Sequence, residues 1–206
     1  MAGYSVLNLG AGKTLYPMDT TPQQIKNELF MVNLDPMYYN ASPASVVETE
    51  HQIWLENGSN YGTMNKLDDE AMPLMERYAL QFDQIVMYRY LEHVARHDLM
   101  YFIYLLSTSL KIGGTVDVVV PNYEKLAQRV LSEDTTDPKF DRDDIITTTE
   151  LLNEPSCPHA SVWTPDRAKH YFEYEGRFIV DSKDIDPDFG FDGRNIYMRF
   201  KATRSK

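Results

Sequence analysis

Short apolar runs alternate along the chain with longer segments whose apolar residues recur at helical spacing. The runs predict strands at 4–9, 30–35, 44–55, 84–88, 116–120, 177–182 and 195–202. Helices are expected after Thr21, at 69–80, at 96–111, at 123–132 and from Thr164-Pro165-Asp166 to Gly176. The pair Gly113-Gly114 is expected to end the helix at 96–111. Strands that alternate with helices favour a mostly parallel sheet with helices on both faces.

The last two strands break this alternation. Ile196, Met198 and Phe200 alternate with polar residues, and a short glycine-containing link at 188–194 precedes them. This pattern predicts a C-terminal antiparallel strand pair. The acidic, threonine-rich segment 133–158 is expected to form a long loop, an excursion from a single domain that spans 1–206.

Composition indicates the cellular location of the chain. No apolar run reaches the roughly 18 to 20 residues that cross a membrane, and the first ten residues lack a basic segment followed by a long apolar one. We therefore expect neither a membrane span nor a signal peptide. The one cysteine, Cys157, excludes an internal disulfide and a cysteine-rich zinc site. A reducing, cytoplasmic location is expected.

The net charge of the chain indicates which kinds of substrate it can bind. The net charge is −11, and basic residues cluster only in the last six positions, KATRSK. Such a chain repels polyanions, so a nucleic-acid substrate is not expected.

A glycine turn follows the first predicted strand. The run Val6–Leu9 leads into Gly10 and Gly12, and the second strand is followed by Asp35, 23 residues after Gly12. Nucleotide-binding α/β folds place a ribose-binding carboxylate at about this distance from the glycines. The pattern indicates a ligand that contains a nucleoside. A P-loop is excluded because Leu7 occupies the position of its first glycine.

Four motifs in a fixed order carry a family resemblance. They are VLNLGAGK at 6–13, MVNLDP at 31–36, FDQIVMYRYLEHV at 82–94 and SLKIGGTVDVVVP at 109–121. The chain resembles class I S-adenosylmethionine-dependent methyltransferases, and Asn8 with Lys13 is similar to a branch of small predicted methyltransferases with an LNLG-x-G-K motif. The resemblance implies a Rossmann-like α/β fold and S-adenosylmethionine as cofactor.

The resemblance also implies which residues bind the cofactor. They are Asn8, Gly10, Ala11 and Gly12 for the methionine portion, Asp35 with Pro36 for the ribose, and Asp68 for the adenine. Each has a plainer interpretation. The glycines fit an ordinary strand-to-helix turn. Asp35 fits a helix N-cap or the acid of an Asp-Pro turn, and Asp68 fits a helix N-cap. Many family members carry an acid where this chain has Asn8, and Thr14 replaces the third glycine of the loop.

Catalytic candidates follow the fourth strand. Tyr88, at its carboxyl end, is expected either to line the methyl-transfer cleft or to belong to the core. His93 is the candidate general base, because its side chain titrates near neutrality; alternatively, it locks the turn by bonding to backbone. His93 and His97 have the spacing of metal ligands on one helical face, but no third ligand is evident nearby, so no metal is expected. His159 is expected either to cover the site or to stay solvated.

The resemblance implies methyl transfer from S-adenosylmethionine to a small molecule, a sugar or a glycan precursor. A protein partner or a homo-oligomer is also considered. The alternative is a methyltransferase-like subunit that has lost catalysis and serves as a binding or structural part of a viral or other assembly. Asn8, Thr14, the segment 133–158 and the 14 tyrosines motivate this alternative. Methylation of a protein or nucleic acid is a third possibility.

Overall fold

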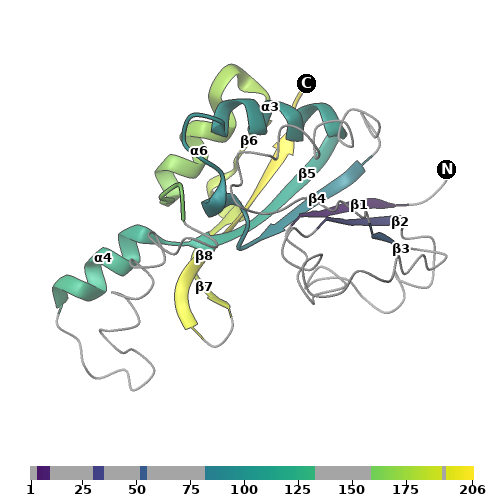
Figure 1. Cartoon of the computed structure of the whole chain (residues 1–206). Helices are drawn as coiled ribbons and strands as arrows, with labels where there is room; N and C mark the ends of the chain where they lie inside the picture. Colours follow the sequence, from purple (N-terminus) through teal and green to yellow (C-terminus); the bar gives the residue numbers. More distant parts are fainter. Residues whose placement is uncertain (1–3, 10–29, 35–51, 55–81, 133–158, 192–193) are drawn as a thin grey trace.

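The computed structural model describes residues 4–9, 30–34, 52–54, 82–132, 159–191 and 194–206, and the structural statements below refer to these (Figure 1). The helices expected after Thr21 and at 69–80, and the long loop expected at 133–158, lie outside the described residues. None of the described helices is both long and apolar enough to span a bilayer.

One mixed sheet forms the centre of the molecule, in the order β3-β2-β1-β4-β5-β8-β6, with β7 paired to β8. The first five strands are parallel: β1 Ser5–Leu9, β2 Phe30–Leu34, β3 Gln52–Trp54, β4 Phe82–Tyr88 and β5 Leu110–Pro121. The remaining strands pair antiparallel: β6 Phe178–Ile179, β7 Ile185–Phe191 and β8 Arg194–Arg204. This confirms the predicted α/β, Rossmann-like fold with a C-terminal antiparallel pair.

Two helices cover one face of the sheet. They are α3 (Leu99–Ser109) and α6 (Pro165–Glu173), which lie on the same side in Figure 1. Alternate residues of the central strands meet them in one apolar core, with members such as Ile85, Met87, Val118, Phe172 and Phe200. Burying side chains of this size stabilises the fold by about 1.5–3 kcal/mol each.

The opposite face carries a smaller apolar cluster and a buried ion pair. Helix α4 (Tyr123–Ser132) packs Leu126 against Val119 and Tyr197 there. Asp117, only 1% exposed, accepts from Arg199 Nε at 2.9 Å and from Nη2 at 2.5 Å. Helices therefore contact both faces, as the sequence predicts.

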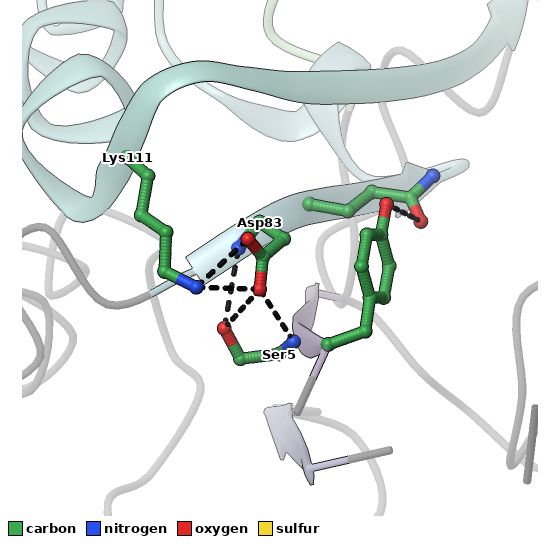
Figure 2. A network of polar contacts seen from close by, with 5 residues as sticks. Ser5, Asp83 and Lys111 are labelled. Carbon is green, nitrogen blue, oxygen red and sulfur yellow. Dashed lines mark hydrogen bonds and ion pairs between the residues drawn. The ribbon is translucent and has the colours of Figure 1, made fainter. Parts of the chain in front are cut away.

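A polar network joins β1, β4 and β5 at the amino-terminal end of β1 and β4 (Figure 2). The Asp83 carboxylate accepts from the Ser5 amide at 2.8 Å and from the Ser5 hydroxyl at 2.9 Å. Lys111 Nζ lies 2.7 Å from both Asp83 oxygens. Burial tends to raise the pKa of Asp83, but the bonds from Lys111 and Ser5 outweigh it and lower the pKa overall.

Two boundaries predicted from the sequence are wrong. The helix expected at 96–111 ends at Ser109, and Gly113 and Gly114 lie inside β5 rather than stopping the helix. The register of β5 against β4 jumps there, from Phe82↔Leu110 to Gln84↔Thr115, so the glycines serve a bulge. The link expected at 188–194 is also largely strand, because β7 extends to residue 191 and β8 begins at residue 194.

Candidate functional site

The strand order creates a switch point between β1 and β4. The chain proceeds from β1 to β2 and β3 on one side, and β4 then lies on the other side of β1. Leu9, the last residue of β1, is the register partner of Leu34 in β2 and of Met87 in β4. The carboxyl ends of all three strands therefore lie at one edge of the sheet. Open α/β sheets bind ligands at such an edge, beside the point where the strand order reverses.

The predicted cofactor residues follow these strand ends. Gly10 comes directly after Leu9, and Asp35 directly after Leu34. They lie outside the described residues, as do Ala11, Gly12, Pro36 and Asp68, so their roles stay predictions. Asn8 is described: it is buried, 4% exposed, and faces Asn33 and Val86 in register within the sheet.

The chain turns sharply where β4 ends. Arg89 adopts φ of 58°, which is unusual for a residue with a side chain, and its amide donates to the Val119 carbonyl at 2.7 Å. A 3-10 turn, η3 (Leu91–His93), follows at once. Strained backbone of this kind gathers at functional sites, where surrounding contacts hold it in place.

Tyr88 points to the sheet face that carries Asp117. Its hydroxyl donates to Asp117 Oδ2 over 3.4 Å, a long hydrogen bond, and its ring packs beside Val6 and Val86. This arrangement gives Tyr88 a structural partner, and the catalytic role expected for it stays a prediction.

The structure brings His93 together with its neighbour Glu92 and with His159, which the sequence did not connect to it. A carboxylate oxygen of Glu92 and one ring nitrogen each of His93 and His159 all lie within 4.8 Å of one another. The His93 and His159 rings meet edge to face, with centroids 4.9 Å apart. We call Glu92, His93 and His159 the carboxylate–histidine cluster. His159 therefore lies against His93 rather than out in solvent.

Backbone hydrogen bonds hold the two halves of this cluster together. The carbonyl of Glu92 accepts from the amides of Ala160 at 2.8 Å and Ser161 at 2.9 Å. The Ser161 hydroxyl donates to the Leu91 carbonyl at 3.1 Å, and Trp163 Nε1 donates to that hydroxyl at 2.9 Å. Because Trp163 is fully buried, these bonds anchor the 159–161 segment to the core.

Burial sets the protonation of the cluster. Desolvation raises the pKa of Glu92 to about 8, against smaller lowering effects of its own backbone amide and of Arg89. Desolvation, followed by the charges of His93 and Arg89, lowers the pKa of His159 to about 4. Tyr123, whose hydroxyl lies 3.0 Å from His159 Nδ1, has its pKa raised to about 12, first by burial and then by Glu92.

The expectation that His93 and His97 share a helical face is wrong. The turn η3 ends at His93, and α3 begins only at Leu99. His97 lies 75% exposed, with Nε2 at 3.2 Å from Asp98 Oδ2. The contact between His93 and His159 was hidden from sequence reasoning, since 66 positions separate the two residues.

Comparison with solved structures agrees with this architecture. No known family profile matches the chain, and no curated protein matches it. The fold is similar to that of an S-adenosylmethionine-dependent methyltransferase from Mesorhizobium loti, with a TM-score of 0.57 and 14% identity over 98% of this chain and 91% of that one. It is also similar to the Burkholderia thailandensis 1,6-didemethyltoxoflavin-N1-methyltransferase, solved with 1,6-didemethyltoxoflavin and S-adenosylhomocysteine bound, with a TM-score of 0.54 and 11% identity over 99% of this chain and 72% of that one. The chain has the fold of class I methyltransferases.

Proposed function

We propose that the protein transfers the methyl group of S-adenosylmethionine to a small molecule, a sugar or a glycan precursor. The observation that carries the proposal is the switch point between β1 and β4. Strands β1 and β2, which precede Gly10 and Asp35, end at the same edge of the sheet as β4, which precedes the carboxylate–histidine cluster. A cofactor and an acceptor bound at this edge would lie side by side.

Methyl transfer from a sulfonium requires few catalytic groups from the protein. The sulfonium is already a good leaving group, so the site has to align the acceptor with the methyl group and exclude water. The chain's glycine turn and Asp35 are proposed to hold the adenosine and methionine portions. His93, half-buried at the end of η3, is proposed to take a proton from the acceptor.

The likeness to known methyltransferases supports the cofactor. The Burkholderia protein was solved with S-adenosylhomocysteine and a small heterocyclic substrate. The match to that protein covers 99% of the present chain, so few of these residues remain for a separate substrate-recognition domain. These points favour a small acceptor over a macromolecule, as does the net charge of −11.

Calorimetric titration with S-adenosylmethionine and S-adenosylhomocysteine tests the proposal. We expect saturable binding of one ligand per chain, lost in Asp35→Ala and retained in His93→Ala, because the histidine is placed on the acceptor side. Absence of binding at millimolar ligand would reject the enzyme and support the alternative, a methyltransferase-like subunit without catalysis.

A further inference from the structure

The carboxylate–histidine cluster contains a buried carboxylate with no visible partner. Glu92 is 0% exposed, and among the described residues neither of its carboxylate oxygens has a hydrogen-bond partner. A buried polar group without a partner costs free energy, and a buried charge costs more. Glu92 is therefore either protonated or matched by a cation.

The neighbours of Glu92 are ligands for a metal. Imidazole and carboxylate are the donors that Zn²⁺, Fe²⁺ and Mn²⁺ accept in proteins. Ligand bonds of about 2.0–2.2 Å place the atoms around one such ion about 3–4 Å apart. The donor atoms of Glu92, His93 and His159 already lie within 4.8 Å of one another, so small side-chain rotations bring all three onto one ion.

A further residue orients one of the ligands. Tyr123 Oη lies 3.0 Å from Nδ1 of His159. When Nδ1–H donates to the tyrosine oxygen, Nε2 keeps its lone pair for an ion. Metal-bound histidines commonly have such an outer hydrogen bond, which fixes the tautomer and the ring orientation.

We propose that Glu92, His93 and His159 form a binding site for one divalent first-row transition-metal ion at the carboxyl end of β4. The pairing of η3 with the 159–161 segment builds the site, because the Glu92 carbonyl accepts from both Ala160 and Ser161. Three protein ligands leave coordination positions open to water or substrate, as in catalytic metal sites.

The substrate class follows, and this step rests on the proposed function, with His93 binding the ion here instead of taking the acceptor's proton. An ion at the open edge binds a hydroxyl oxygen of the acceptor and lowers its pKa. The O–H bond breaks and its proton passes to water; the oxygen's electron pair forms a bond to the methyl carbon; the C–S bond breaks and its pair stays on sulfur, leaving S-adenosylhomocysteine. The acceptor is therefore an alcohol or a sugar hydroxyl.

Titration of the untagged, chelator-treated protein tests the ion site directly. We expect one Zn²⁺ per chain by calorimetry and a Co²⁺ absorption spectrum with nitrogen and oxygen ligands. Glu92→Gln and His159→Gln each remove a ligand, so each should lower the Zn²⁺ affinity by more than the roughly 10- to 100-fold that loss of an outer hydrogen bond produces. His97→Gln is the matched control, because the exposed ring of His97 lies shortly after the turn η3. The Zn²⁺ affinity of this variant should equal that of the wild type.

Two further measurements keep the test decisive. Circular dichroism checks that each variant folds, and Tyr123→Phe, which leaves all three ligands in place, weakens Zn²⁺ binding by a smaller factor. Absence of stoichiometric Zn²⁺ or Co²⁺ binding, or an affinity unchanged in Glu92→Gln, overturns the metal site. Titration with S-adenosylhomocysteine is a separate test. If the protein binds the ion but does not bind S-adenosylhomocysteine, the metal site is supported and the proposed methyl transfer is rejected.

Discussion

Asp83 is the residue on which the amino-terminal ends of β1 and β4 depend. It binds Ser5 and Lys111 at once, and its side chain is 24% exposed. Asp83→Asn replaces the charged acceptor with a neutral one. We expect a loss of about 1 kcal/mol of unfolding free energy at pH 7, a value below the usual range for charged hydrogen bonds because Lys111 is partly solvated. Urea unfolding measures it.

The same variant has a pH signature. The pKa of Asp83 is lower in the folded protein than its ordinary value, so its carboxylate stabilises the fold above the unfolded-state pKa. The contribution disappears as the pH falls through the folded-state pKa. The difference between wild type and Asp83→Asn therefore narrows on acidification below about pH 4. Asp184→Asn, at an exposed position, is the control; an equal gap at pH 7 and pH 3 would contradict the assignment.

Asp117 and Arg199 form a buried pair on the opposite face of the sheet. Asp117 is 1% exposed and binds the guanidinium through both oxygens. Asp117→Ala leaves the arginine charge uncompensated, and we expect a loss of about 3 kcal/mol of unfolding free energy. The double variant Asp117→Leu with Arg199→Met should recover at least about 1 kcal/mol of that loss. Denaturant unfolding of the single and double variants measures these losses. If the losses of the single variants simply add in the double variant, Asp117 and Arg199 are not energetically coupled.

At this scale the sequence indicated His93 as a candidate base and His159 as a residue that covers the site or stays solvated, but it did not indicate that the two meet. His93 stands out because histidine titrates near neutrality and follows a predicted strand. Glu92 becomes notable only when its burial and missing partner are seen. His159 comes next to both through backbone bonds from Ala160 and Ser161, and such long-range pairing leaves no periodic signal in the sequence.

Among the elements, α6 shows how a local signal fixes a helix start. Thr164 has extended backbone, and its hydroxyl accepts from the Arg167 amide at 3.2 Å, with Pro165 in the first helical position. Thr164→Ala should cost about 1 kcal/mol of unfolding free energy, since it removes the cap. Thr164→Ser keeps the capping hydroxyl and should leave the unfolding free energy nearly unchanged, because serine caps at least as well as threonine. Thermal or urea unfolding compares the two, and equal losses would exclude the cap as the cause.

The bulge in β5 gives two glycines different constraints. Gly113 has φ of +79°, and a Cβ there would meet open space. A Cβ on Gly114 would lie 2.9 Å from the Lys111 carbonyl oxygen and 3.1 Å from that of Asp83. Gly113→Ala should cost about 1–2 kcal/mol from strain alone, and Gly113→Asn less. Gly114→Ala should cost more than Gly113→Ala, because backbone has to move; the reverse order in urea unfolding would contradict this.

This bulge also explains why the helix boundary was missed. Two adjacent glycines after an apolar helix normally indicate its end. Here Leu110 begins the strand directly after Ser109, and the glycines let β5 change register against β4. The link before β8 was missed for a related reason. Pro187 and Gly190 weaken the strand pattern of β7, although the irregular pairing of β7 with β8 tolerates both.

For the whole molecule, the parallel character of the sheet was the most predictable feature. Strands that alternate with helices favour parallel pairing. The described strands β1 to β5 are all parallel, as predicted. What the pattern does not contain is which loops meet at the carboxyl edge, since that depends on the register of strands distant in sequence, such as Leu9 with Leu34 and Met87.

The cofactor proposal predicts a global effect, because a ligand bound across the ends of β1, β2 and β4 binds only the folded state. S-adenosylhomocysteine at 100 times its Kd should raise the unfolding free energy by about 2.7 kcal/mol, seen as a higher Tm. Asp35→Ala should lose this shift. Asp83→Asn lies at the opposite edge of the sheet. Its Tm without ligand should be lower than that of the wild type, but S-adenosylhomocysteine should raise this Tm by the full amount. A shift that persists in Asp35→Ala would place the ligand elsewhere on the molecule.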